Sequence, residues 1–159
     1  MNDIHRPFKN ALGKFATGIV VAACKTPDGG FSALTVNSFT SVSLDPPLVL
    51  WCLETKAASC PTFMSADAYS ISVLRADGEA LSNRFASHAP EPLAENEYEL
   101  WETGAPILKD RIAGFDCRIF SRHKAGDHVV LVGEVVKFDS EDGAPLVYFA
   151  SQYGTVQSP

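Results

Sequence analysis

The segment of residues 35–43 is dense in hydroxyl and amide side chains, and it lies between two apolar stretches of the chain. It follows an alternating segment that begins at Phe31 and precedes the almost wholly apolar residues 48–53. Its polar side chains are Thr35, Asn37, Ser38, Thr40, Ser41 and Ser43. Buried hydroxyls beside core strands need hydrogen-bond partners. The partners are either the protein's own turns or a bound ligand, and composition alone favours the turns.

Bulk properties predict one globular domain over residues 1–159, with enough apolar content (46%) to form a sizeable core. The formal charge of −6 disfavours nucleic acid and anionic membranes as partners, because both need a basic face. The longest apolar runs are far shorter than the roughly 20 residues that span a bilayer. No signal-peptide core stands at the N-terminus, and no CxxC pair occurs among the four cysteines. We therefore expect a cytoplasmic protein in a reducing compartment.

The hydrophobic pattern predicts many short strands and few helices. A helix is expected over residues 7–17 with Gly18 ending it, and shorter helices are expected after Ser59 and Asp77. Strands are expected over residues 19–25, 31–36, 48–53, 69–74, 114–122, 128–138 and 146–149. Residues 86–97 are polar and bear prolines, which is typical of a long surface loop that covers a site. The frequent tight turns favour a mainly β antiparallel barrel with peripheral helices over βαβ units.

Several familiar sites are absent: no GxGxxG motif follows a strand, and no P-loop, HExxH or GxSxG motif occurs. His123 and His128 flank a predicted turn over residues 124–127 and could face each other, but no third metal ligand is evident, so no metal site is expected. A phosphate could instead be held by the polar segment together with Ser59, Lys56 and Arg84. The alternative is that these hydroxyls form their hydrogen bonds with other groups of the protein.

Two long runs resemble the flavin reductase family, whose fold is the FMN-binding split barrel. They are Gly13-x-Phe15-Ala-Thr-Gly18-Ile-Val-Val and Thr35-Val-Asn-Ser-Phe-Thr-Ser-Val-Ser-Leu-Asp-Pro-Pro-Leu-Val-Leu50. The likeness continues through Leu81-Ser-x-Arg84-Phe85-Ala, Gly126-Asp-His128 and Pro145-Leu-x-Tyr148-Phe149, and it covers roughly residues 8–153. Members of this family are the small reductase partners of two-component flavin monooxygenases.

The resemblance implies a six-stranded antiparallel split β-barrel that forms a homodimer and holds flavin near the dimer interface. By residue matching, Thr35, Val36, Asn37 and Ser38 would line the isoalloxazine edge, with Ser41, Val42 and Ser43 close by. Cys52 and Leu53 would lie beside the ring and the ribityl chain. Ser59, Arg84 and Phe85 match positions near the phosphate end or the adenosine side of the flavin. His128 matches a histidine near the nicotinamide site, and Tyr153 lies in a tail that could approach it.

The implied activity is NAD(P)H:flavin oxidoreduction, in which FMN or FAD accepts hydride from NADH or NADPH and the reduced flavin passes to a separate oxygenase. The flavin would carry the chemistry, which accounts for the absence of an acid–base dyad. Two alternatives remain open: reduction of another acceptor, such as a cobalt corrinoid, and flavin binding without turnover. Ser32, Cys60 and Pro61 depart from the family pattern. These departures leave the choice between FMN and FAD open.

Overall fold

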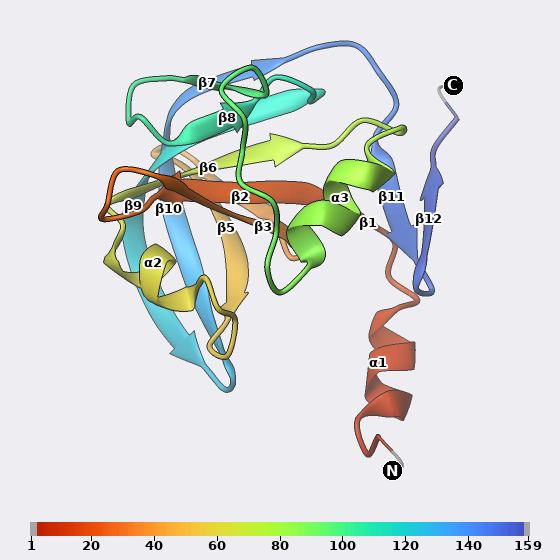
Figure 1. The fold of residues 1–159 in the computed structure, drawn as a ribbon. Helices are drawn as coiled ribbons and strands as arrows, with labels where there is room; N and C mark the ends of the chain where they lie inside the picture. The colour runs from red at the N-terminus through yellow and green to blue at the C-terminus, as the bar shows by residue number, and fades with distance from the viewer. Residues whose placement is uncertain (1–2, 158–159) are drawn as a thin grey trace.

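The computed structural model describes residues 3–157 as a twisted antiparallel sheet with helices at its periphery (Figure 1). The helices are α1 (Arg6–Leu12), α2 (Cys60–Ser65) and α3 (Glu79–Ala86). The strands are β1 (Thr17–Gly18), β2 (Val20–Lys25), β3 (Phe31–Val36), β4 (Thr40–Leu44), β5 (Pro47–Glu54), β6 (Ala68–Val73), β7 (Tyr98–Leu100), β8 (Pro106–Leu108), β9 (Ala113–Ala125), β10 (His128–Ser140), β11 (Leu146–Phe149) and β12 (Gln152–Thr155).

The principal sheet has seven strands in the order β3-β2-β6-β9-β10-β5-β4, and every neighbouring pair is antiparallel. The predicted mainly β antiparallel architecture is therefore confirmed, although this sheet has one strand more than the expected six. The additional edge strand is β4, which folds back on β5 so that Leu44 pairs with Pro47. Two smaller sheets, β7-β8 and β1-β11-β12, complete the strands of the described residues.

The core lies on both faces of β2, which is why that strand is apolar at every position from Val20 to Cys24. Val20, Ala22 and Cys24 belong to a cluster around Trp51, whose ring lies 5.0 Å from that of Phe63. The alternate residues Val21 and Ala23 belong to a second cluster, in which α3 contributes Phe85 and β11 contributes Leu146. Fully burying a large apolar side chain stabilises the fold by roughly 1.5–3 kcal/mol. These clusters fix β3, the β5–α2 connection and α3 around one region of the sheet.

Two helix boundaries differ from the predictions. The first helix ends at Leu12 with Gly13 as its C-cap, so Gly18 does not end it. Thr17 and Gly18 instead pair with Tyr148 and Val147 as β1, because the ladder with β11 satisfies their backbone groups better than another helical turn. Asp77 does not cap the helix that follows it: Gly78 is the N-cap of α3.

The hairpin of β9 and β10 is longer than predicted. Its turn is only Gly126 and Asp127, and Gly126 has a φ of +63°, a conformation that glycine adopts without steric cost. His123 pairs with Val130 and His128 pairs with Ala125, so the two histidines do not oppose each other directly. The short tail expected after residue 149, which contains Gln152 and Tyr153, forms the strand β12 and pairs with β11.

Candidate functional site

A cavity of about 480 Å³ lies where β3, the β5–α2 connection and the loop after α3 converge. In Figure 1, the green loop that follows α3 dips below that helix and then runs up to β7. The lining residues are Thr26, Phe31, Ser32, Ala33, Leu34, Glu54, Lys56, Ala57, Ala58, Ser59, Thr62, Ala86, Ser87, His88 and Pro90. Of the residues matched to flavin contacts, only Ser59 belongs to this lining.

Ser59 is the most informative residue of the cavity. Its hydroxyl is buried and has no hydrogen-bond partner within residues 3–157, although Ser59 occupies the N-cap position of α2. A buried hydroxyl without a partner costs free energy, so a ligand atom is the natural acceptor or donor for it. Lys56 adds an ammonium group to the same lining, and Glu54 adds a carboxylate. Hydroxyls beside a cation are suited to binding an anion such as a phosphate.

His128 is held at the rim of this region by the hairpin tip. In the β10–β5 ladder it pairs with Glu54, and both the backbone N–H and the hydroxyl of Thr55 donate to the carbonyl of Asp127 at 2.9 Å. The His128 Nδ1 lies 2.7 Å from the Asp127 carboxylate, and this hydrogen bond lowers the pKa of Asp127. Nδ1 therefore carries the proton that Asp127 accepts, which leaves Nε2 directed to other partners.

The polar segment is satisfied in part by the protein itself. Thr35 donates its hydroxyl to the carbonyl of Ser82 at 2.7 Å. The Ser38 hydroxyl accepts the backbone N–H of Cys52 at 2.9 Å and donates to the carbonyl of Cys52 at 3.3 Å. Among the described residues, the side chains of Asn37 and Ser41 are exposed and make no hydrogen bond within the chain. Composition favoured the protein's own turns as partners; the partners of Thr35 and Ser38 do lie within the protein, but in helix α3 and strand β5.

The other residues matched to the flavin ring differ in how far their side chains are buried. Val36 is half-buried against the core cluster around Trp51, whereas Val42 is 47% exposed on the edge strand β4. Ser43 is half-buried on β4. On β5, Leu53 is fully buried in the core, whereas Cys52 is half-buried on the opposite face. Because side chains alternate along a strand, only Cys52 of this pair can present its side chain to a ligand.

Alkylation of the native protein should therefore distinguish the strand cysteines. We expect Cys52 to react at least about tenfold faster than Cys24, since burial raises the pKa of the Cys24 thiol to about 12 and reactivity requires the thiolate. Burial also raises the pKa of Cys117. Mass spectrometry after timed iodoacetamide treatment measures this order, with and without FMN. Equal labelling of Cys52 with and without saturating FMN would remove Cys52 from the flavin site.

Arg84 and Phe85 anchor α3 and the loop that follows it. The Arg84 guanidinium donates to the Glu97 carboxylate at 2.7 and 3.1 Å, to the carbonyl of Glu91 at 3.2 Å and to the carbonyl of Pro92. This pairing lowers the pKa of Glu97 and raises that of Arg84. Phe85 is only 1% exposed and lies in the second core cluster. Arg84 thus holds residues 86–97 in place, and the first residues of that loop form a wall of the cavity.

Glu97→Gln should loosen this loop. The lowered pKa of Glu97 means that its stabilising contribution is present above the ordinary glutamate value of about 4.3 and is lost as the pH falls through the lowered value. Because the pair is partly exposed, we expect amide exchange across residues 87–97 to quicken by only about twofold to fivefold. Hydrogen exchange at neutral pH measures this, with Glu95→Gln as the control from the same loop. Identical protection in both variants would contradict the role of the pair.

Tyr153 lies apart from His128 within one chain. It belongs to β12, and its hydroxyl lies 2.8 Å from the Ser82 hydroxyl and donates to the Asn83 side chain at 3.1 Å. Ser82 in turn accepts from Thr35 through its carbonyl, so Tyr153 is linked to the start of the polar segment. His128 belongs to the principal sheet and Tyr153 to the β1-β11-β12 sheet.

The cavity also contains residues that sequence reasoning did not assign to a site. Phe31, whose ring packs edge-on 4.9 Å from that of Tyr98, forms part of the lining. Thr62, Ser87, His88 and Pro90 do so as well. The polar, proline-bearing composition of residues 86–97 was the one available signal, since it indicated a loop that covers a site.

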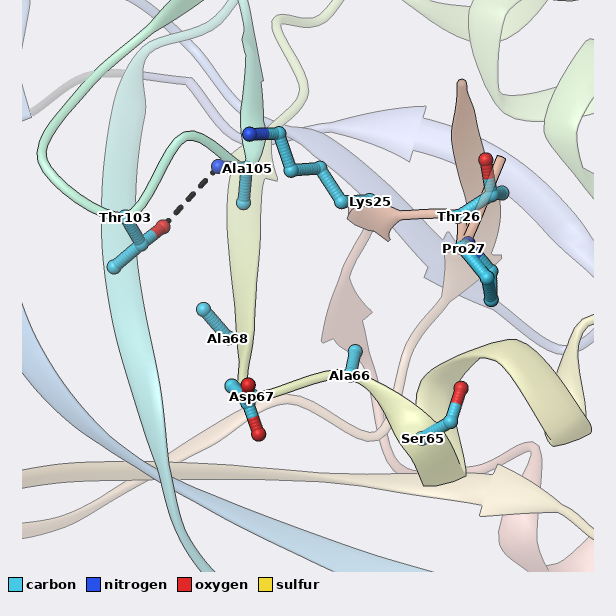
Figure 2. A pocket seen from close by; sticks show the side chains of 9 residues that line it. All are labelled: Lys25, Thr26, Pro27, Ser65, Ala66, Asp67, Ala68, Thr103 and Ala105. Carbon is cyan, nitrogen blue, oxygen red and sulfur yellow. Dashed lines mark hydrogen bonds between the residues drawn. The ribbon is translucent and has the colours of Figure 1, made fainter. Parts of the chain in front are cut away.

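A second cavity, of about 350 Å³, lies between the β2–β3 turn, the start of β6 and residues 103–105. Figure 2 shows the Lys25 side chain extending toward Thr103 and Ala105, whose backbone N–H donates to the Thr103 hydroxyl at 3.2 Å. The Thr103 backbone and hydroxyl also donate to the buried carboxylate of Asp116. This lining contains none of the predicted site residues, so the larger cavity is the better candidate site.

Comparison with known proteins agrees with this fold. Residues 12–157 match the family model described as the flavin reductase like domain. The chain is 42% identical to the FMN reductase (NADH) SmoA of Agrobacterium fabrum over 94% of this chain and 84% of that protein. It is 36% identical to the NADH-dependent flavin reductase of a Rhodococcus species, over 94% and 85%.

Among solved structures, the flavin reductase PheA2 superposes with a TM-score of 0.87 at 33% identity, covering 99% of this chain and all of the other. The flavin reductase component BorF of a bacterial two-component tryptophan halogenase gives a TM-score of 0.89 at 31% identity, covering 97% and 99%. The fold is thus the flavin reductase split barrel, and the chain belongs to the flavin reductase family.

Two further features concern the described part of the chain. No cluster of three or more histidine, cysteine or acidic side chains arranged to hold a metal ion occurs within residues 3–157. None of the helices there has the length and apolar character needed to cross a bilayer.

Proposed function

We propose that the 480 Å³ cavity and the adjoining polar segment bind flavin so that a nicotinamide nucleotide can reduce it. The protein is an NAD(P)H-dependent flavin reductase that uses FMN or FAD as acceptor and NADH or NADPH as donor. It works as a single domain. The observation that carries the proposal is the buried, unpartnered hydroxyl of Ser59 beside Lys56, in a chain whose family reduces flavins.

The phosphate end of the flavin lies at Ser59 and Lys56 in this proposal. The ring lies along residues 35–38, mostly against backbone groups, with Ser41, Val42 and Ser43 of β4 beside it. The side chain of Cys52 and the backbone of Leu53 border the ring and the ribityl chain. Arg84 acts through the loop that it holds, because its guanidinium already binds Glu97 and two carbonyls. Phe85 acts through the position of α3, since it is buried in the core.

The bound nucleotides supply the chemistry, in which hydride passes from nicotinamide C4 to flavin N5. The protein's contribution is to hold the two rings in close contact and to exclude water. Backbone donors near Asn37 and Ser38 stabilise the negative charge that develops on the flavin. His128, fixed by Asp127, positions the nicotinamide through Nε2. Tyr153 braces α3 and the polar segment from the other side.

The working form is a homodimer in this proposal. Helix α1 projects away from the sheet (Figure 1), and Phe8, Leu12 and Phe15 are 65%, 58% and 78% exposed. Apolar side chains gathered in this way on an isolated chain mark an interaction surface. Light scattering should give twice the chain mass for the unmodified protein and a single-chain mass for Phe8→Glu. A single-chain mass for the unmodified protein would contradict the dimer.

The reduced flavin passes to a separate oxygenase, as the names of several relatives imply for those proteins. One such relative is the reductase component of 4-hydroxyphenylacetate 3-monooxygenase from Thermus thermophilus, 35% identical over 92% of this chain. We place the reaction in the cytoplasm, a reducing compartment in which the four free cysteines stay reduced.

Measuring NADH and NADPH oxidation by the purified protein, with FMN, with FAD and with no flavin, tests this function. We expect flavin-dependent turnover with at least one nucleotide. A protein that retains flavin but oxidises neither nucleotide would favour the binding-only alternative. Turnover that needs a cobalt corrinoid as acceptor would favour the other.

A further inference from the structure

The start of the 86–97 loop supplies the cavity with side chains that have no role so far. Ser87 and His88 lie directly after α3, and both line the cavity together with Lys56 and Ser59. They come from a part of the chain about thirty residues beyond Ser59. Besides β3, two separate segments therefore border the cavity, the β5–α2 connection and this loop.

The position of these residues is fixed by hydrogen bonds on both sides. On one side, the Ser87 backbone N–H donates to the carbonyl of Arg84 and closes α3. On the other, the Arg84 side chain binds the carbonyls of Glu91 and Pro92. Only four residues separate Ala86 from Glu91. Because this short segment is fixed at both ends, His88 is held at the cavity wall.

The donors of the two segments are suited to one ligand group. Lys56 contributes an ammonium, Ser59 a buried hydroxyl without a partner, Ser87 a hydroxyl and His88 an imidazole. An imidazole N–H donates a hydrogen bond to a phosphate oxygen whether or not the ring is protonated. Glu54 is the one carboxylate of the lining, and it pairs with His128 in the β10–β5 ladder at the rim. The donors therefore favour a phosphate over an uncharged group.

We propose that His88 is a specificity residue that selects phosphorylated flavin over riboflavin. The proposal rests on the proposed function, because it assumes that the cavity holds the phosphate end of the flavin. His88 donates to the phosphate from the loop, while Lys56 and Ser59 bind it from the β5–α2 connection. Riboflavin lacks the phosphate and gains nothing from these three residues.

Titrating FMN and riboflavin separately into the protein, with flavin fluorescence as the readout, tests this selection. The unmodified protein should bind FMN more tightly than riboflavin. His88→Gln should lower that preference about threefold to tenfold, because the amide donor is placed differently from the imidazole N–H and weakens one charge-assisted hydrogen bond near solvent. His88→Glu should lower it further through repulsion, and His88→Lys should retain it. The affinity for riboflavin should be the same in all these variants. A general disturbance of the loop would instead change the riboflavin affinity as well.

His123→Gln is the matched control, since His123 is exposed on β9 and lies outside the cavity lining. It should leave both affinities unchanged. The same preference for FMN in His88→Glu as in the unmodified protein would overturn the role of His88 while leaving the proposed function intact. Failure of the unmodified protein to bind either flavin would overturn both. Flavin binding by the unmodified protein therefore tells the two outcomes apart.

Discussion

Replacing Gly133 with alanine should lower the free energy of unfolding by about 3 kcal/mol, the upper part of the range for overpacking a core. A Cβ at this position would lie 2.4 Å from the Tyr69 hydroxyl oxygen, 2.7 Å from Tyr69 Cζ and 2.9 Å from Cys117 Cβ. Tyr69 is fully buried, and its ring lies 5.9 Å from that of Trp51, so it has no free space into which to move. Urea denaturation followed by tryptophan fluorescence measures the loss.

Gly154→Ala provides the control, because no heavy atom lies within 4 Å of a Cβ built there. Its effect should be within about 0.5 kcal/mol, as for most surface substitutions. Adding Tyr69→Phe to Gly133→Ala should recover part of the loss, since the nearest clashing atom is then removed. An unchanged denaturation midpoint for Gly133→Ala would show that the Tyr69 ring does not lie against Gly133.

Replacing His128 with alanine should raise the KM for the nicotinamide nucleotide about tenfold, while the KM for flavin changes little. The imidazole is fixed by Asp127 at the tip of the β9–β10 hairpin, and that tip is tied to Thr55 beside the cavity. Losing a positioning hydrogen bond to the substrate costs about 1–2 kcal/mol, which corresponds to roughly tenfold. Steady-state kinetics with each substrate varied in turn measures both constants.

Asp127→Asn tests whether the orientation of the His128 imidazole matters, since the variant keeps the imidazole itself. The amide can still bond Nδ1 but no longer fixes its proton, so we expect an effect of the same kind and smaller size. Lys124→Ala, on the exposed end of β9, is the matched control at the same hairpin. A flavin KM that rises as much as the nicotinamide KM in His128→Ala would place His128 in the flavin site instead.

The sequence predicted the parts of the fold that follow from burial alone. Residues 20–24 are apolar at successive positions because both faces of β2 are covered, and this pattern indicated a buried strand. The glycine at position 126 likewise predicted the hairpin turn of β9 and β10. These features depend on local composition and on nearby residues, which a single sequence displays directly.

Other features depend on distant pairing and were not predictable in the same way. Thr17 and Gly18 leave the helical pattern because Tyr148 and Val147, far along the chain, pair with them. Residues 152–155 become a strand only because β11 is available beside them. The apolar spacing of residues 7–17 predicted a helix, yet Phe8 on this helix is 65% exposed. The proposed homodimer would cover it with a second chain, and the periodicity of one sequence does not reveal such a partner.

The candidate site, like the fold, was predictable from the sequence only in part. The polar segment was conspicuous in the sequence, but the bonds of Thr35 to Ser82 and of Ser38 to Cys52 are long-range contacts. Arg84 matched a family position near the phosphate, yet its guanidinium is bound to Glu97 thirteen residues away. The composition of residues 86–97 indicated a loop that covers a site, but only the folded chain shows that His88 of this loop lines the same cavity as Lys56 and Ser59. Resemblance identified the ligand class, and the structure identifies which side chains are available to it.

The most direct test of the central claim is anaerobic mixing of the purified protein, FMN and NADH, with the visible absorbance of the flavin followed in time. We expect rapid bleaching that depends on the protein and on the nicotinamide nucleotide, with one flavin reduced for each nucleotide oxidised. FAD and NADPH are tested in the same way. A flavin absorbance that stays constant with both nucleotides and both flavins, in a correctly folded protein, would contradict it.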